Sequence, residues 1–219
     1  MEPVPLSPAR RRASLDRLAA QVSDVLVIGG GVTGAGTALD AATRGLAVGL
    51  VEQRDYAAGT SSRSSKLIHG GLRYLEQLNI GLVREALEER GLILQHLAPH
   101  LVRPVSFLYP LTHHGWERAY VGAGVALYDR LGGAEQLPGH RHLSRKGALA
   151  LAPSLRRDSM VGAIRYWDAQ VDDARHTMEV VRTAAAYGAE VANSTRVTGL
   201  LREGERVVGV RVVDQEDGR

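Results

Sequence analysis

The sequence predicts an α/β fold in which a Rossmann-like parallel sheet, completed by a β-hairpin, is interrupted by an antiparallel domain. Three observations support this fold class. A β-rich run, a glycine-rich turn, a helical segment and a second β-rich run follow one another over residues 24–52, which is the order of a βαβ unit. A proline-bounded strand at 105–111 opens a region without that order. A helix, a third short strand and a hairpin then indicate a return to the first sheet.

Composition limits the function classes. Apolar residues make up 44% of the 219 residues, so a core can form. The absence of cysteine excludes disulfides, thiolate metal sites and thiol catalysis, and it fits a reducing compartment. The net charge is only +3 and aromatic residues are few, so no nucleic-acid partner is predicted. No metal site is predicted either, because the adjacent His113 and His114 would point to opposite faces of a strand.

Residues 1–22 are interpreted as a polar N-terminal extension with a short helix around Leu15 to Ala20. A secretory signal would continue with an apolar run and a small-residue cleavage site, which this sequence does not have. No apolar run approaches the roughly 18 residues that a membrane-spanning helix needs.

The glycine motif G-x-G-x-x-G is formed by Gly29, Gly31 and Gly34, directly after a predicted strand at Val25 to Ile28. The first glycine permits the tight turn, the second permits close approach of a pyrophosphate, and the third permits close helix–strand packing. Glu52 lies 18 positions after Gly34, about where an acidic residue binds a ribose hydroxyl. The pattern predicts dinucleotide binding; the alternative is a purely structural βαβ unit. Because Glu52 would repel a 2′-phosphate, NAD or FAD is favoured over NADP.

The segment after Glu52 is rich in hydroxyl groups. Five of six positions carry one: Thr60, Ser61, Ser62, Ser64 and Ser65. These side chains suit hydrogen bonding to a diphosphate or a ring edge, although a flexible polar loop has the same composition. "KLIHGGLRYLE" follows, in which Gly70 and Gly71 leave bare backbone where a flat ring could lie.

The motifs "GGGVTGAG", "TSSRSSKLIHGGLRYLE", "LAPHLVRPVSFLYP", "LYDRLGG", "LSRKGALALAP" and "DAQVDDARHTMEV" together resemble the FAD-dependent glycerol-3-phosphate dehydrogenases. These enzymes belong to the D-amino-acid-oxidase-like flavoprotein superfamily. The resemblance runs from about Asp24 to the C-terminus. It implies that FAD is the cofactor.

The resemblance also implies roles for single residues. Arg73 and Tyr74 would bind the substrate, with the Arg73 fork on its phosphate, and Lys66 would face the same anion. His69 would lie near the reacting carbon as the catalytic group. The remaining implied contacts are to FAD: backbone from Val197 at the adenine and from Gly70 and Gly71 near the flavin ring. The alternatives are a surface ion pair with Glu76 for Arg73 and a packed, non-catalytic histidine for His69.

The implied activity is oxidation of sn-glycerol 3-phosphate to dihydroxyacetone phosphate in glycerol metabolism. Hydride would pass from C2 to flavin N5, and the electrons would pass to a membrane quinone. The implied protein is cytoplasmic or peripheral on the inner face of the cytoplasmic membrane, and a homo-oligomer. Three alternatives remain: an oxidase that uses oxygen, a related flavoprotein that acts on amino acids, and a cofactor-binding product without turnover.

The predicted organisation has four parts: the extension at 1–22, the first part of the FAD-binding domain at 23–102, a partial substrate domain at 103–165, and the second, incomplete part of the FAD-binding domain at 166–219. The C-terminus is expected to be truncated, because the family that the sequence resembles continues with a strand that ends in an alanine–threonine–glycine turn.

Secondary structure is predicted for the remaining segments as follows. An amphipathic helix at Gly81 to Leu97 would bury Leu82, Ala86, Ile93 and Leu97. Ala119 to Tyr128 would be a buried helix or a membrane-surface contact. The other predicted elements are helices at Thr37 to Thr43 and at Asp173 to Tyr187 with Asp172 as cap, strands at Ala47 to Val51, Val105 to Leu111 and Ala189 to Ala192, and a hairpin of Val197 to Leu201 with Val207 to Val213.

Overall fold

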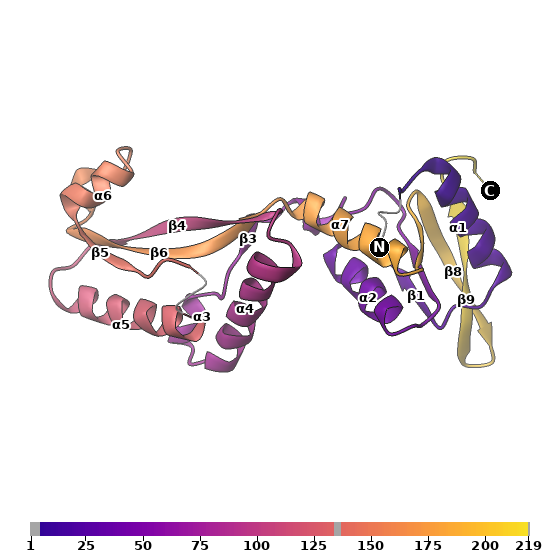
Figure 1. The fold of residues 1–219 in the computed structure, drawn as a ribbon, viewed down its shortest axis with the longest axis horizontal. Coiled ribbons are helices and arrows are strands. Elements are labelled where there is room, and N and C mark those ends of the chain that lie inside the picture. Colours follow the sequence, from indigo (N-terminus) through magenta and orange to yellow (C-terminus); the bar gives the residue numbers. More distant parts are fainter. Residues whose placement is uncertain (1–4, 134–136, 219) are drawn as a thin grey trace. The chain divides into compact units, whose positions relative to one another are not determined.

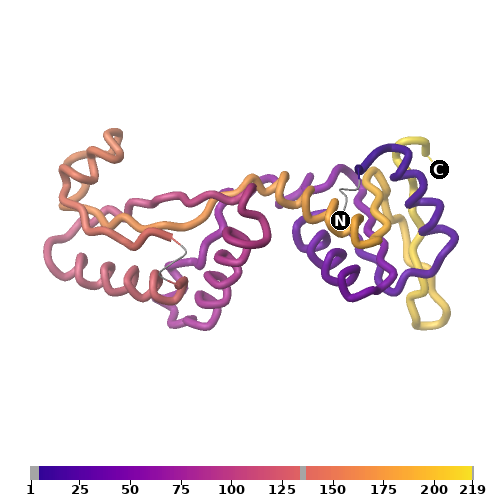
Figure 2. Tube along the Cα trace, in the orientation of Figure 1, coloured from indigo at the N-terminus to yellow at the C-terminus, as the bar shows by residue number. Residues whose placement is uncertain are grey.

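The computed structural model describes residues 5–133 and 137–218. The chain forms two compact units (Figure 1). Unit 1 contains the residues up to Ser65 and those from Asp172 onward, and unit 2 contains Lys66 to Val171. The trace in Figure 2 runs through unit 1, then through unit 2, and back into unit 1.

A parallel three-stranded sheet forms the centre of unit 1. Its strands are β1 (Val25–Ile28), β2 (Val48–Val51) and β7 (Glu190–Ala192), in the order β1-β2-β7. Both pairings are parallel, so the three predicted strands of this sheet are confirmed.

Two helices pack on one face of this sheet. They are α2 (Val32–Thr43) and α7 (Asp173–Ala186), and small side chains let them approach closely: Ala35, Ala38, Ala41, Ala42, Ala184 and Ala185 share a core with Val48 and Leu50. Asp172 caps α7 by accepting the backbone N–H of Arg175 at 3.2 Å, as predicted. Helix α2 begins five positions before the predicted Thr37. The prediction placed the start too late because the two glycines in the first turns lower the helix propensity of that stretch.

Helix α1 (Pro8–Ala20) covers the opposite face, where a Cβ on Gly49 of β2 would lie 2.6 Å from Leu18. The predicted helix around Leu15 to Ala20 lies within α1, but the interpretation of this segment as an extension is wrong for the described residues, because α1 packs on the sheet; residues 1–4 lie outside them. Several polar side chains of α1 bind other parts of unit 1. Arg17 binds Glu190 at 2.5 and 2.8 Å, and Ser14 donates to the same carboxylate at 2.6 Å.

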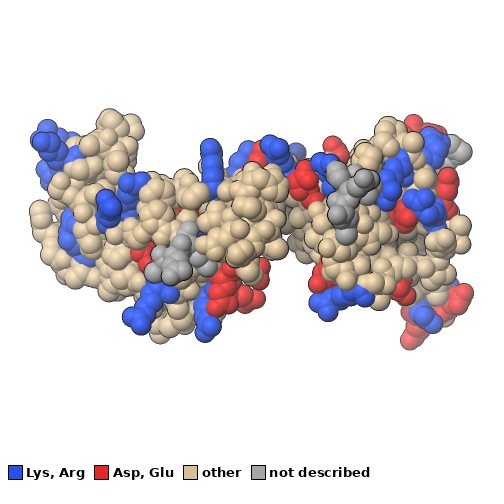
Figure 3. All heavy atoms as spheres, viewed as in Figure 1, with Lys and Arg blue, Asp and Glu red and all other residues tan. Residues whose placement is uncertain are grey.

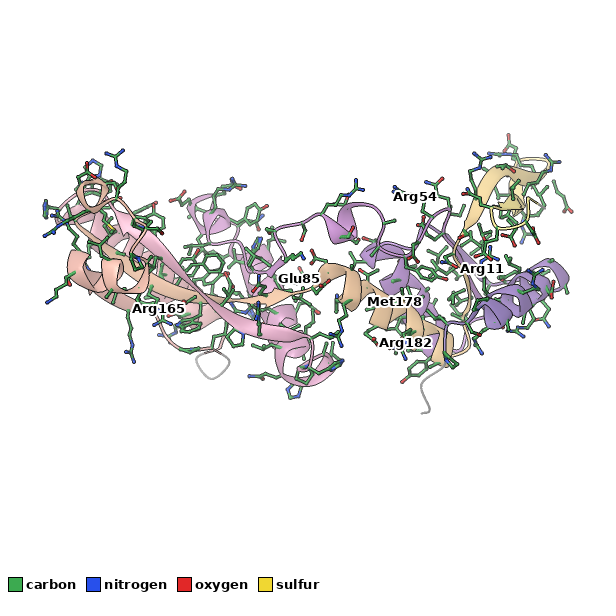
Figure 4. The ribbon with its side chains drawn as sticks, turned by 90° about the horizontal axis from the view of Figure 1, so that it is seen from above. Arg11, Arg54, Glu85, Arg165, Met178 and Arg182 are labelled. Carbon is green, nitrogen blue, oxygen red and sulfur yellow. The ribbon has the colours of Figure 1, made fainter. Side chains whose placement is uncertain are left out.

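The hairpin of unit 1 pairs β8 (Thr195–Glu203) with β9 (Arg206–Asp214), so the predicted hairpin is confirmed. Its turn is Gly204–Glu205, one position later than predicted, with Gly204 at φ +61°. Arg11, labelled in Figure 4, reaches from α1 to the end of β9 and binds both oxygens of Asp214 at 2.5 and 3.0 Å.

Unit 2 contains an antiparallel sheet built around β6 (Gly162–Val171). β4 (Val102–Leu111) pairs with β6 along its whole length, and β3 (Leu67–Ile68) and β5 (Arg141–Ser144) also pair with β6. The predicted antiparallel domain is thus confirmed. β4 contains Pro104 and Pro110, which an edge strand tolerates because one row of its N–H groups has no ladder partner.

The helices of unit 2 are α3 (Arg73–Glu76), α4 (Ile80–Leu92), α5 (Trp116–Leu131) and α6 (Arg145–Leu151). A π-turn at Ile93–Leu97 extends α4, and short 3₁₀ turns lie at Thr60–Ser62 in unit 1 and at Arg157–Ser159 in unit 2.

The apolar face predicted for the helix at 81–97 is wrong at Leu82 and Leu97, whereas Ile93 packs against a buried cluster as predicted. Val83, Leu87 and Arg90 are buried, whereas Leu82 and Leu97 are 44% and 69% exposed. The π-turn breaks the 3.6-residue period beyond Leu92, and the buried face includes a paired arginine, so hydropathy alone selected the wrong side.

Helix α5 is buried on one face only. Val121, Val125 and Tyr128 face the core, whereas Tyr120 and Leu127 are exposed. Of the two alternatives predicted for Ala119 to Tyr128, the buried helix is therefore correct for one face only.

The unit boundaries also differ from the predicted domain boundaries at 102/103 and 165/166. The chain leaves unit 1 after Ser65 and returns at Asp172. Leu67 and Ile68 pair with Gln170 and Ala169 of β6, and this long-range pairing assigns the whole segment 66–102 to unit 2.

Candidate dinucleotide site and substrate segment

The glycine turn of unit 1 depends on contacts that only glycine permits. Gly29 has φ +110° and donates its N–H to Val51 O at 2.8 Å. A Cβ on Gly34 would lie only 2.0 Å from the carbonyl oxygen of Gly29, which no side chain can occupy. The predicted reason for Gly34, close packing of helix on strand, is present in the structure.

The N-terminus of α2 is open toward the turn. Gly31 occupies the N-cap position and gives no side-chain cap. The hydroxyl oxygen of Ser61 accepts the backbone N–H of Val32 at 2.9 Å, and a Cβ on Gly31 would lie 3.1 Å from that oxygen. A helix N-terminus of this kind attracts phosphate through its free N–H groups and its dipole. The structure therefore places Ser61, alone among the predicted hydroxyls, directly at the helix end.

Glu52 follows β2 and holds the turn from the other side. Its Oε2 accepts the backbone N–H of Gly30 at 2.7 Å, and its Oε1 accepts that of Arg54 at 2.8 Å. Each carboxylate oxygen has a further lone pair, so Glu52 can also accept a hydroxyl group. Tyr56 packs under the turn, and burial raises the pKa of its phenol, so it is neutral.

The other predicted hydroxyls are spread along the loop. Ser62 donates to Gly59 O at 3.3 Å, and Ser64 donates to the carboxylate of Asp173 in the first turn of α7. Thr60 and Ser65 are exposed. Val197 lies on β8, where it pairs with Val212 just before an irregularity in the ladder. The structure thus brings Gly29, Gly31, Gly34, Glu52 and Ser61 together but leaves the remaining hydroxyls and Val197 outside this cluster.

The substrate segment lies in unit 2. Lys66 has φ +60°, β3 follows, and His69 is exposed while Gly70 is buried. A Cβ on Gly71, which has φ +68°, would lie 2.4 Å from the ring of Tyr74.

Arg73 begins α3, and its guanidinium carbon lies 6.0 Å from the centroid of the Tyr74 ring. That distance places the cation at the limit of a cation–π contact. The proposed alternative, pairing with Glu76, is not among the ion pairs of the described residues. His69, Gly71, Arg73 and Tyr74 therefore lie within one short turn.

Gly70 is explained by packing inside unit 2. A Cβ there would lie 2.5 Å from Leu87 and 3.0 Å from the hydroxyl of Tyr128. That hydroxyl accepts the Gly70 N–H at 2.7 Å and donates to the carboxylate of Asp168, which also binds Arg90 at 2.6 Å. Sequence reasoning missed these three residues. The usable signal was the spacing of Val83, Leu87 and Arg90, which lie on one helical face.

The described residues hold no group of three or more histidine or acidic side chains that could bind a metal ion. Within the same residues, no helix is both long and apolar enough to cross a membrane. On the face drawn in Figure 3, basic and acidic side chains are interspersed over each unit.

Comparison with known proteins identifies similar chains. Residues 24–219 match the family model described as FAD dependent oxidoreductase, DAO. The chain is 64% identical over 213 residues to a glycerol-3-phosphate dehydrogenase of Mycobacterium leprae, which covers 97% of this chain and 36% of that protein. It is 45% identical over 227 residues to the mitochondrial glycerol-3-phosphate dehydrogenase of Rattus norvegicus, covering 97% of this chain and 31% of that protein.

Among solved structures, the glycerol-3-phosphate dehydrogenase from Bacillus halodurans complexed with FAD matches 95% of this chain and 34% of that one, with a TM-score of 0.72 and 32% identity. The chain thus spans about a third of the length of the relatives it matches. The family model covers most of the chain, with the glycine turn and Glu52 inside the matched region. The chain belongs to the FAD dependent oxidoreductase family, whose cofactor is FAD.

Proposed function

We propose that this chain forms part of an enzyme that oxidises sn-glycerol 3-phosphate to dihydroxyacetone phosphate with FAD. The observation that supports this substrate most directly is the 64% identity, over 97% of the chain, to a protein named glycerol-3-phosphate dehydrogenase. The predicted substrate residues fall within the aligned length. Because the chain spans 36% of that relative, the activity is proposed for the whole protein.

The residues of unit 1 fit the adenosine diphosphate portion of FAD. Gly31 has no side chain at the N-terminus of α2, and the hydroxyl of Ser61 lies at the same helix end, an arrangement that suits a pyrophosphate. Glu52 keeps free lone pairs for a ribose hydroxyl while it holds the turn. The hydroxyl of Ser61 would hydrogen-bond a phosphate oxygen, and the backbone of Val197 would contact the adenine. Thr60, Ser62, Ser64 and Ser65 would line the same loop as further hydrogen-bonding groups.

The residues of unit 2 fit the substrate. Arg73 is exposed at the start of α3, where its guanidinium can present two parallel N–H groups to a phosphate. Tyr74 lies beside it as a hydroxyl donor, and Lys66 adds a positive charge. His69 is exposed one position before the buried Gly70, and its imidazole would take the proton of the C2 hydroxyl. FAD, when bound, supplies the hydride acceptor.

A quinone is the proposed electron acceptor, and a peripheral contact with the cytoplasmic membrane surface is proposed with it. The outer face of α5 supports the second proposal. Trp116, Tyr120 and Leu127 are exposed along one side of that helix, and aromatic residues of this kind favour the interface between lipid and water. A homo-oligomer is proposed for the whole protein.

The decisive experiment is an anaerobic titration of the flavin-loaded whole protein. We expect glycerol 3-phosphate to bleach the flavin absorbance and to yield dihydroxyacetone phosphate in equal amount. A panel of D- and L-amino acids serves as control. Bleaching by an amino acid, with none by glycerol 3-phosphate, would contradict the proposed substrate and leave the FAD assignment intact.

A further inference from the structure

Three elements of unit 2 converge on one backbone N–H group. Arg90 from α4 binds Oδ1 of Asp168 at 2.6 Å, and Asp168 lies on β6. The hydroxyl of Tyr128 from α5 lies 2.9 and 3.0 Å from the two oxygens of that carboxylate. Since the only hydrogen of this hydroxyl points to Asp168, its oxygen is left to accept, and it accepts the N–H of Gly70 at 2.7 Å.

This network is buried throughout. The side chains of Arg90 and Asp168 are 4% and 5% exposed, and Tyr128 is among the most buried residues of the chain. Burial, together with the neighbouring carboxylate, raises the pKa of Tyr128, so the phenol remains a neutral donor. Burial raises the pKa of Asp168, while Arg90 and Tyr128 lower it by binding its charged form.

An ion pair of this kind is weak evidence for stability, because desolvation of the two charges offsets their attraction. Its geometric effect is clearer. A carboxylate held by Arg90 fixes the direction of the Tyr128 hydroxyl, and the hydroxyl fixes the backbone at Gly70. Leu87 packs against the same position, because a Cβ on Gly70 would lie 2.5 Å from it. The backbone at Gly70 is therefore held by a hydrogen bond and by packing together.

The neighbours of Gly70 are the residues on which the proposed chemistry depends. His69 directly precedes it in the chain, so the backbone that carries the imidazole continues into the held Gly70 peptide. Gly71 follows with φ +68°, and its carbonyl accepts the N–H of Tyr74 at 2.8 Å. α3 has this anchor of its own, whereas β3 ends at Ile68 and His69 lies beyond the ladder.

We propose that Tyr128, oriented by Asp168 and Arg90, is a positioning residue that fixes the Gly70 backbone and thereby the His69 imidazole for the proton transfer. The proposal rests on the proposed function of His69. It assigns to Tyr128 an effect on the chemical step and not on substrate binding, since the phosphate-facing Arg73 lies on the separately anchored α3.

The test is Tyr128→Phe in the whole, flavin-loaded protein, which removes only the hydroxyl. The matched control is Tyr166→Phe. Tyr166 is partly buried and packs edge-on against Tyr128 at 6.4 Å, yet its hydroxyl makes no hydrogen bond within the described residues. We expect Tyr128→Phe to lower the rate constant for flavin reduction at saturating glycerol 3-phosphate by about 10- to 100-fold, as expected for a misplacement of about 1 Å.

The same variant should keep its flavin content and a KM within about twofold of the wild type, and Tyr166→Phe should change neither quantity. An unchanged rate constant in Tyr128→Phe would overturn the proposal. The proposal would also be overturned if Tyr128→Phe lost flavin and thermal stability and raised KM to a similar extent, because such a result indicates a structural role only.

A second measurement separates this inference from the proposed function. Amide hydrogen exchange over residues 67–72 should be faster in Tyr128→Phe and unchanged in Tyr166→Phe. If glycerol 3-phosphate does not reduce the wild-type flavin, the proposed function fails, and the exchange result alone then decides whether Tyr128 anchors Gly70. Equal exchange in both variants would reject the anchor.

Discussion

Glu52 accepts the backbone N–H of Gly30 at 2.7 Å, so the acidic residue at the end of β2 also holds the glycine turn that follows β1. Its second oxygen accepts the backbone N–H of Arg54 at 2.8 Å. One carboxylate thus stabilises two loops of the same sheet edge, and the fit of this edge to a dinucleotide depends on it.

Inverting the charge at this position should abolish FAD binding. Glu52→Arg removes both carboxylate oxygens, which hold the glycine turn and would accept a ribose hydroxyl. The whole protein should therefore purify without flavin. Glu52→Gln keeps one acceptor oxygen and should retain part of it. The measurement is the ratio of flavin to protein absorbance. Glu85→Arg is the control, because Glu85 is exposed on α4. Normal flavin content in Glu52→Arg would refute the assignment.

Two glycines of α2 should respond in opposite ways to alanine. Gly34→Ala places a Cβ 2.0 Å from Gly29 O and should destabilise the protein by about 3 kcal/mol, the upper end for overpacking. Gly36→Ala meets nothing within 4 Å and should stabilise it by about 0.5–1 kcal/mol through helix propensity. Denaturant unfolding measures both. Equal effects would mean that the turn does not pack as described.

The buried arginine of α1 should be far more important than its neighbour. Arg11→Ala leaves the Asp214 carboxylate without its main partner and should cost about 3–5 kcal/mol. Arg12 is exposed and lies 3.7 Å from Asp217, so Arg12→Ala should cost under about 1 kcal/mol. Thermal unfolding of the two variants checks the difference. Similar losses would show that α1 is not anchored through Arg11.

The same pair should make stability depend on pH. The hydrogen bond from Arg11 lowers the pKa of Asp214 in the folded state. A lowered folded pKa contributes stability that is present above the ordinary aspartate pKa of about 3.9 and is lost as the pH falls through the folded pKa. The melting temperature should therefore fall more steeply below about pH 4 in the wild type than in Asp214→Asn. Parallel curves would exclude a contribution from Asp214.

Local patterns predicted the elements whose cause is local. The strand Val25–Ile28 and the cap at Asp172 match the structure, because a short run of β-forming apolar residues and an N-cap carboxylate are each evident within a few positions. The glycine turn was predicted with its reasons, since the 2.0 Å approach at Gly34 follows from the motif itself.

Elements fixed by distant partners were not predicted. Arg11 looks like a solvated residue until Asp214, which lies 203 positions away, is placed beside it. Arg90 of α4 likewise seems to belong on a surface, and its burial against Asp168 turns the helix face by one position from the predicted one. In both cases an ion pair that forms only in the folded chain overrides the hydropathy pattern.

Arg73 should govern substrate affinity without affecting the cofactor. It is exposed at the first position of α3, and the turn that precedes it is closed by the bond from Tyr74 N to Gly71 O at 2.8 Å. Arg73→Lys keeps the positive charge but loses the two parallel N–H groups that match a phosphate. In the whole protein we expect the KM for glycerol 3-phosphate to rise about tenfold, a loss of about 1.4 kcal/mol, with unchanged flavin content. Arg84→Lys is the control, because that exposed arginine pairs with Glu88 on α4. Glycerol, which lacks the phosphate, should be a poor substrate for wild type and Arg73→Lys alike. A KM equal to that of the wild type would leave Arg73 with a structural role only, and the phosphate contact would then have to come from another cation.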